Sequence, residues 1–220
     1  MCGRINVSDH PGVQALLDDL GIPLFQSSLT PRYNIAPGAQ LVTAFANEGG
    51  PEAKVQATVM EWGIVPPWAK DKAMRPLINA RSETVWEKPS FRHLVKSKRA
   101  IIPANGFYEW KREGKTKTPY YIHPTDKAAF GFASIFQISK EGLMQCCVIT
   151  TATNTAMSSI HDRMPVILPS ETMKDWLLSE DRGFLDSLLQ PCPDADIQLV
   201  QVSPYVSNAR NEGEACIQPV

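Results

Sequence analysis

The residues with the clearest chemical potential stand at the start of the chain, which reads MCGR. A methionine followed by a side chain as small as cysteine is normally removed during synthesis, so we expect the mature chain to begin at Cys2. An amino-terminal cysteine carries an amine and a thiol on adjacent carbons, with ordinary pKa values of about 8 and about 8.5. With an aldehyde, the amine forms a Schiff base and the thiol then closes a five-membered thiazolidine ring. The alternative interpretation is a cysteine at position 2 that has no chemical role.

Two further segments carry groups suited to moving protons. In NGFYEW (105–110), a strand over Phe107–Trp110 places Phe107 and Glu109 on one face. The carboxylate then lies beside apolar neighbours, where burial suits it to carrying protons near neutral pH. His161 stands in IHDR, in a turn that leads into a strand at Pro165. Both residues also have structural explanations, because a strand glutamate commonly pairs with a cation and a histidine commonly fixes a turn.

A third set of side chains is suited to binding and orienting a substrate. In LINARSE (77–83), Asn79 and Arg81 share a face if the segment is extended. Asparagine can orient a substrate through its amide, and arginine can hold a phosphate through two parallel hydrogen bonds. Arg4, two residues after Cys2, places another cation close to the candidate nucleophile.

These residues require a scaffold, and the sequence predicts one made of many short strands. Hydrophobic residues at helical spacing predict a helix over Pro11–Leu20, which Gly21 ends. Strands are expected at Gln56–Trp62, Arg99–Pro103, Phe107–Trp110, Tyr120–His123, Ala129–Phe136, Gln145–Thr151, Pro165–Leu168 and Ile197–Val202. Further helical stretches are expected at Ser82–Glu87, Glu171–Ser179 and Gly183–Leu189. This order predicts a single α+β domain over residues 1–220, with a curved antiparallel sheet or barrel-like core and flanking short helices.

Composition limits the class of protein. The chain has 220 residues, 43% of them hydrophobic, which is enough for a full core, and it contains no apolar run of the roughly 20 residues needed to span a bilayer. The five cysteines are odd in number and lack C-x-x-C spacing, which argues against a disulfide framework and a zinc site. We expect reduced thiols in a cytosol, with Cys146 and Cys147 of the apolar run QCCVITT in the core.

Charge is distributed unevenly although the formal net charge is only −1. The stretch from Lys70 to Arg112 holds eleven lysines and arginines against four acidic residues. A solvated surface explains many such stretches, and a groove for a nucleic-acid backbone is the functional alternative.

Seven motifs together resemble one family. They are MCGR, RYNIAPG, the WG…P-W pattern, INARSET, NGFYEW, IHDRMP and the closing NEGEACIQPV. In this order, over nearly the whole chain, they are similar to the SRAP family, the SOS response-associated peptidases or abasic-site processing proteins. The resemblance implies a protein that binds abasic sites in single-stranded DNA, including junctions with duplex, and traps the ring-opened sugar aldehyde covalently.

The resemblance also implies roles for particular residues. Cys2 would be the nucleophile that forms the thiazolidine, and Asn79 would position the terminus and the opened sugar. Glu109 would relay protons while the Schiff base forms, and His161 would act as acid and base at the sugar hydroxyl and during reversal of the crosslink.

The remaining residues carried over by motif would bind DNA. Arg4, Arg81 and Arg163 match phosphate-contacting arginines, while Pro37 and Trp68 match an apolar wedge against the bases that flank the lesion. Backbone contacts carry no base information, so no sequence specificity is expected.

The resemblance further implies a monomer that uses no cofactor and no metal, makes no membrane contact, and acts in the cytoplasm of a bacterial cell, at the nucleoid when bound to DNA. Three other functions remain open. One is a cysteine peptidase that uses Cys2 and His161 and removes Met1 from its own chain. The others are an amino-terminal-nucleophile amidotransferase, whose domains also begin Met-Cys-Gly, and a non-catalytic single-strand binder, which has no need of Cys2.

Overall fold

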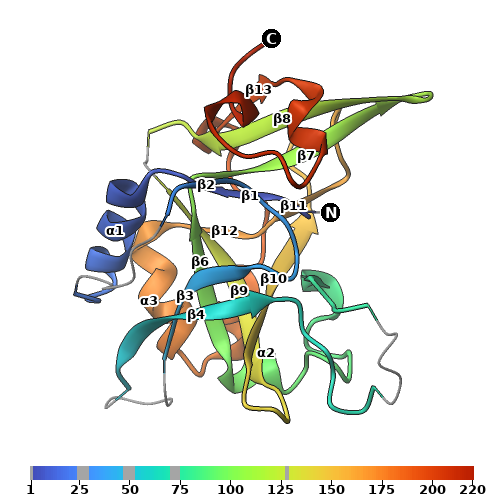
Figure 1. The fold of residues 1–220 in the computed structure, drawn as a ribbon. Coiled ribbons are helices and arrows are strands. Elements are labelled where there is room, and N and C mark those ends of the chain that lie inside the picture. The colour runs from blue at the N-terminus through green and yellow to red at the C-terminus, as the bar shows by residue number, and fades with distance from the viewer. Residues whose placement is uncertain (1, 24–29, 47–52, 70–74, 127–128) are drawn as a thin grey trace.

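Two β-sheets, one above the other in Figure 1, make up most of the molecule. The computed structural model describes residues 2–23, 30–46, 53–69, 75–126 and 129–220. Every pairing in the first sheet is antiparallel. Its strand order is β13 (Ile197–Gln201), β8 (Thr116–Pro124), β7 (Gly106–Glu113), β1 (Ile5–Val7) and β2 (Arg32–Ile35).

The second sheet closes on itself. Its ring runs through β10 (Met144–Ala152), β4 (Val55–Trp62), β3 (Gln40–Ala46), β6 (Arg99–Ala104) and β9 (Phe130–Ile138), and β9 pairs again with β10. The short strands β5 (Asn79–Arg81), β11 (Arg163–Pro165) and β12 (Ile167–Leu168) are added to β10 and β9. β10 is the centre of this barrel-like sheet, which explains why residues 145–151 are all buried and why its sequence reads as one apolar run.

Short helices cover the sheets. α1 (His10–Asp19) buries Val13, Leu16 and Leu17, the stripe that predicted it. The other helices are α2 (Leu94–Ser97), α3 (Met173–Leu178) and α4 (Arg182–Ser187). Asp181 caps α4 by accepting hydrogen bonds from two backbone N–H groups. Single 3₁₀ turns lie at Ser82–Thr84, Ser170–Thr172, Asp194–Asp196, Pro204–Ser207 and Glu214–Cys216.

One hydrophobic core joins the two sheets into a compact domain. Phe107 of the first sheet packs against Phe132 of the second, with ring centroids 5.9 Å apart. A second, smaller cluster lies on the other face of the first sheet, where Tyr108 and Tyr121 pack beneath Val206 and Cys216 of the carboxyl-terminal segment. The first sheet is therefore covered on both faces.

Most predicted elements are present, but two of them and the strand pairing of the second sheet differ from the prediction. The α+β class, the barrel-like core and the flanking helices are confirmed, but β4 and β5 pair parallel with β10, so the second sheet is mixed instead of wholly antiparallel. The run expected at Pro165–Leu168 divides at Val166 into β11 and β12, which pair with different strands. The stretch expected at Ser82–Glu87 is helical only over the 3₁₀ turn Ser82–Thr84.

The described residues include no helix that is both long and apolar enough to cross a membrane. All five cysteines are free and buried, and Cys146 and Cys147 lie in the core as expected.

Candidate active site

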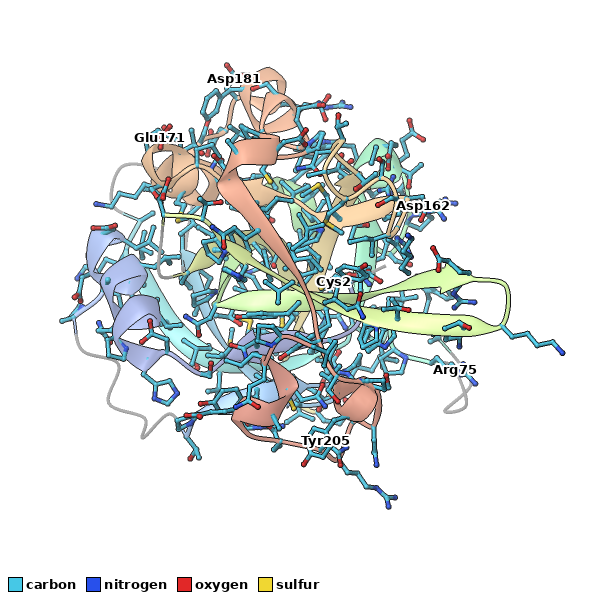
Figure 2. The ribbon with its side chains drawn as sticks, turned by 90° about the horizontal axis from the view of Figure 1, so that it is seen from above. Cys2, Arg75, Asp162, Glu171, Asp181 and Tyr205 are labelled. Atoms are coloured by element: carbon cyan, nitrogen blue, oxygen red, sulfur yellow. The ribbon has the colours of Figure 1, made fainter. Side chains whose placement is uncertain are left out.

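Cys2 lies at the start of the first sheet, beside the β7–β8 hairpin (Figure 2). Asn79 in β5 holds the chain here, because its Nδ2 donates a hydrogen bond of 2.8 Å to the carbonyl oxygen of Cys2. Two residues on, the backbone N–H of Tyr108 in β7 donates to the carbonyl oxygen of Arg4 at 3.0 Å. The start of the chain is thus fixed between an element of the second sheet and an element of the first.

The thiol of Cys2 is protonated at neutral pH. Its side chain has no exposed surface, and burial raises the pKa of the thiol far above its ordinary range, with a further contribution from the nearby Glu109 carboxylate. In this 220-residue chain the nitrogen of Cys2 is part of a peptide bond with Met1, which lies outside the described residues. The structure therefore presents a neutral thiol, and not a preformed thiolate.

Glu109 and His161 face each other next to Cys2. The Glu109 side chain on β7 is 4% exposed, and its Oε2 lies 3.9 Å from Nε2 of His161. The other ring nitrogen, Nδ1, accepts a hydrogen bond of 3.0 Å from the backbone N–H of Arg163. A neutral His161 therefore carries its proton on Nε2, on the side of Glu109. Oδ1 of Asp162 also lies 3.0 Å from Nδ1, but this carboxylate is 87% exposed, so water screens its contact with the ring.

The alternation of β7 explains how a carboxylate comes to be buried here. Phe107 belongs to the main core, whereas Tyr108 and Trp110 belong to the smaller cluster on the opposite face. Glu109 shares a face with Phe107, as the sequence predicts, so the strand pattern itself carries the carboxylate inward.

An open cleft of about 500 Å³ begins at this pair and runs outward along the hairpin. Gly3, Glu109 and His161 line its inner part. Its other lining residues are Arg4, Trp110, Arg112, Lys117 and Ser207. Three cations and one carboxylate thus face the cleft, which favours an anionic occupant.

Arg4 is anchored at the side of this cleft. Its Nη1 donates to Oδ1 of Asn34 at 2.7 Å and to the carbonyl oxygen of Val206 at 3.2 Å, and its guanidinium lies 5.7 Å above the ring of Trp110. Burial lowers the pKa of this guanidinium from its ordinary value. Its Nε is buried and has no hydrogen-bond partner among the described residues.

Asn34 is a residue that sequence reasoning did not single out, although it stands in RYNIAPG. Its side chain is fully buried, and Nδ2 donates to the carbonyl oxygens of Val206, Asn208 and Asn211 at 2.9–3.1 Å. With Oδ1 bound to Arg4, one carboxamide joins the carboxyl-terminal segment to the cleft. The only local sign of its role in the sequence is that this polar residue stands between apolar residues in a strand.

Arg163 and Arg81 lie in different environments. Arg163 forms a bidentate pair with Glu83, and its Nη2 also donates to the carbonyl oxygen of Thr150 at 2.6 Å. The hydrogen bond from Arg163 lowers the pKa of Glu83 below its ordinary value. Arg81 ends β5 with an exposed side chain, beside Thr150 in the strand register. The segment with Asn79 and Arg81 is extended, which is the condition under which the two were expected to share a face, and of the two arginines only Arg81 is exposed.

Pro37 and Trp68 are both exposed, Trp68 to 57%. Pro37 stands in the turn between β2 and β3, where the N–H of Gly38 donates to the carbonyl oxygen of Trp62. Trp68 follows the end of β4, and Nε1 of Trp62 donates to the carbonyl oxygen of Ile78, next to Asn79. Trp62 is therefore hydrogen-bonded both to the turn that holds Pro37 and to the residue before β5, and Trp68 follows Trp62 along the chain.

The described part of the chain contains no group of three or more His, Cys, Asp or Glu side chains that could hold a metal ion. Lys70 and Lys72, two cations of the predicted basic stretch, lie outside the described residues.

Comparisons with known proteins identify the family and agree with the fold. A family model described as SOS response associated peptidase (SRAP) matches residues 1–209. The abasic site processing protein YoqW of Bacillus subtilis is 40% identical over 228 residues, covering 99% of both chains. The abasic site processing protein YedK of Escherichia coli is 31% identical over 233 residues, covering 100% of both. A crystal structure of a protein from Bacteroides thetaiotaomicron matches with a TM-score of 0.83 at 25% identity, covering 100% of both chains.

Fold and site together define a mixed-sheet domain in which the buried Cys2 lies near the Glu109 carboxylate, and this carboxylate faces the imidazole of His161. The chain belongs to the SRAP family.

Proposed function

We propose that this protein binds single-stranded DNA at abasic sites, including junctions with duplex, and shields them by forming a covalent crosslink through Cys2. The observation that carries the proposal is the buried Glu109 carboxylate, 3.9 Å from Nε2 of His161 and close enough to Cys2 to raise its thiol pKa. The curated relatives named above are abasic site processing proteins. An abasic sugar in its ring-opened form offers an aldehyde, which is the partner that a 1,2-aminothiol requires.

The reaction has two bond-forming steps and loses one water. After removal of Met1, the Cys2 amine attacks the aldehyde carbon C1′, and the carbonyl oxygen leaves as water to give an imine. The Cys2 sulfur then adds to the same carbon while its proton moves to the nitrogen. The product is a thiazolidine in which C1′ bonds to both nitrogen and sulfur.

The neighbouring side chains divide the proton transfers between them. Glu109 lies next to Cys2 and relays protons one at a time: those that the amine sheds go to the oxygen that leaves as water, and the thiol proton goes to the nitrogen. His161 carries its proton on Nε2, so it donates toward the sugar oxygen that ring opening exposes and takes that proton back on reversal. Asn79 fixes the Cys2 carbonyl, and its buried Oδ1, without a hydrogen-bond partner among the described residues, is available to the free amine.

DNA contacts surround this centre. Arg81 is exposed for a phosphate, and Arg4 and Arg163 each keep a buried Nε with no hydrogen-bond partner in the described parts of the chain. Pro37 and Trp68 offer apolar surface on which flanking bases can stack. We propose that one copy of the chain is sufficient, because Cys2, Asn79, Glu109 and His161 all come from a single domain.

A peptidase reaction of the same site is limited to a narrower role. A cysteine peptidase works through an activated thiolate, whereas burial and Glu109 hold the Cys2 thiol neutral here. Hydrolysis of the Met1–Cys2 bond, with water added to the carbonyl and the Cys2 amine as leaving group, fits because Cys2 itself lies at the site. It generates the free amine that crosslinking needs.

The proposal is tested by mixing the protein with a single strand that carries one abasic site and running a denaturing gel. We expect a heat-stable adduct, and none with the same strand carrying an intact nucleotide. A chain with a non-removable amino-terminal extension, verified by mass, should form no adduct because an amide nitrogen cannot form an imine. Normal adduct yield from the extended chain would contradict the mechanism.

A further inference from the structure

The outer part of the cleft holds two cations that the proposed chemistry does not use. Arg112 on β7 and Lys117 on β8 stand directly opposite each other near the tip of the hairpin. Both side chains are exposed and both line the cleft. They share a face with Trp110, which pairs with Pro119 one step closer to the centre of the sheet.

These two cations lack an ion-pair partner in the described part of the chain. No carboxylate of the described residues lies within ion-pair distance of Arg112 or Lys117, whereas Lys111, on the opposite face of β7, pairs with Glu113 at 2.8 Å. Like charges directly across a strand pair destabilise a hairpin. An anion between the two side chains would remove this repulsion, so the arrangement is suited to binding one.

The cleft connects this pair with the reaction centre. Glu109 and Arg112 both line the cleft, although they stand three residues apart on β7, about 10 Å along the strand, and their side chains leave opposite faces of it. Trp110, on the face of Arg112, also lines the cleft, and its Nε1 donates a hydrogen bond of 2.9 Å to Oγ of Ser207. A polyanion with one residue at Cys2 therefore reaches the cation pair with its neighbouring units.

We propose that Arg112 and Lys117 form a subsite for the phosphodiester backbone on one side of the abasic nucleotide. This inference rests on the proposed function. It adds the path of the DNA on one side of the abasic nucleotide, which runs outward along the β7–β8 hairpin. The Arg112 guanidinium can hold a phosphate through two hydrogen bonds, and Lys117 adds a point charge. Bases are not read here, so the subsite is indifferent to sequence.

The test uses Arg112→Glu with Lys111→Glu as its matched control, because both make the same charge change on adjacent residues of one strand. Affinity is measured in a Cys2→Ala background, so that only reversible binding is read. The two probes are single strands of equal length that carry the abasic site at the 5′ end or at the 3′ end. Salt is varied to obtain the slope of log affinity against log salt.

We expect Arg112→Glu to weaken binding of one of the two strands, more at low salt than at high salt, and to lower its salt slope by about 0.7–1.4. Arg112→Glu should be at least as resistant to denaturant as the unsubstituted chain, because the introduced carboxylate would face Lys117 with opposite charge. Lys111→Glu should leave both strands bound as before.

Equal effects of the two substitutions, no effect of either, or an equal loss on both strands would overturn the subsite. Failure of the proposed function is seen separately, because it shows as the absence of a Cys2-dependent adduct in the unsubstituted chain. With Cys2 present, Arg112→Glu should still reach the full adduct yield at saturating DNA.

Discussion

Cys2 and Cys147 are equally buried, yet the structure gives them different chemistry. Neither side chain has exposed surface, and burial raises the pKa of both thiols. Cys147 lies in the middle of β10, paired with Ile135 of β9 and surrounded by the barrel core. Cys2 lies ahead of β1, with Asn79 on its carbonyl and the Glu109 carboxylate nearby. Burial alone therefore does not distinguish the proposed nucleophile from a core thiol, and only the polar neighbours of Cys2 and its place near the start of the chain set it apart.

The largest expected effect is a difference in adduct yield between substitutions of these two cysteines. Cys2→Ala should abolish the heat-stable adduct with abasic single-stranded DNA, because an amine without the thiol cannot close the ring. Cys147→Ala is the matched control and should keep full adduct yield while lowering the free energy of unfolding by about 1 kcal/mol. Denaturing gels and denaturant titrations of both variants check this. An adduct of normal yield from Cys2→Ala would remove Cys2 from the mechanism.

Substitutions of the two proposed proton carriers, Glu109 and His161, should affect different steps of the reaction. Positioned acid or base groups typically contribute about 10²–10⁴-fold to a rate. Glu109→Gln should slow adduct formation by a factor in this range, whereas His161→Ala should slow both formation and release and leave an adduct that persists. A chase of purified crosslink with excess abasic DNA measures release. Release from the His161→Ala adduct at the unsubstituted rate would assign His161 to the structural role of holding the turn before β11.

The arginines offer a comparison of their own, since Arg81 is exposed and Arg163 is bound to Glu83. Arg81→Ala should weaken binding of every sequence about equally and lower the salt slope by about 0.7. Glu83→Gln should strengthen binding, because it releases the Arg163 guanidinium for a phosphate. Trp68→Ala should cost about 1–3 kcal/mol of stacking and leave the salt slope unchanged. Salt titrations in the Cys2→Ala background check all three, and weaker binding by Glu83→Gln would show that Arg163 acts only through that pair.

Burial of the thiols also makes the free energy of unfolding depend on pH. Burial raises the pKa of Cys146 and of Cys192 from 9.0 to about 12, and raises those of Cys2 and Cys147 as well. The folded chain keeps these thiols neutral where the unfolded chain ionises them. The free energy of unfolding therefore holds its full value below about pH 9 and falls as pH rises toward about 12.

Denaturant titrations under reducing conditions at about pH 7 and about pH 10 measure this slope. Cys147→Ala removes one titrating group, so its slope should be shallower by about 1.4 kcal/mol per pH unit where that thiol is fully ionised in the unfolded chain. An unchanged free energy of unfolding between the two pH values would contradict the burial of these thiols.

Local pattern predicted the parts of the site that lie within one element. The alternation of β7 placed Glu109 inward, whereas the shared face of Asn79 and Arg81 was expected only on the condition that their segment is extended, as it is in β5. The contacts that complete the site join segments far apart in sequence, such as Arg163 with Glu83 and Asn34 with the carboxyl-terminal segment. These depend on which strands pair, and no periodicity within either segment encodes that choice.

The same limit explains the differences in the second sheet. The apolar run of β10 predicted a buried strand. Its parallel pairing with β4 and β5 depends on the closure of the barrel, which the run does not encode. The pairing of Arg112 with Lys117 could not be predicted from the sequence either, because it depends on the register in which β7 pairs with β8.

The most direct test of the central claim is to locate the crosslink within the protein by mass spectrometry. The adduct is formed with an abasic single strand, the nucleic acid is digested to the sugar remnant, and the amino-terminal peptide is sequenced. The account predicts that Met1 is absent, that the remnant is on Cys2 with a mass equal to the sum of the parts less one water, and that neither the Cys2 amine nor its sulfur reacts with labelling reagents. A remnant on a lysine, or a Cys2 sulfur that still alkylates in the adduct, would contradict it.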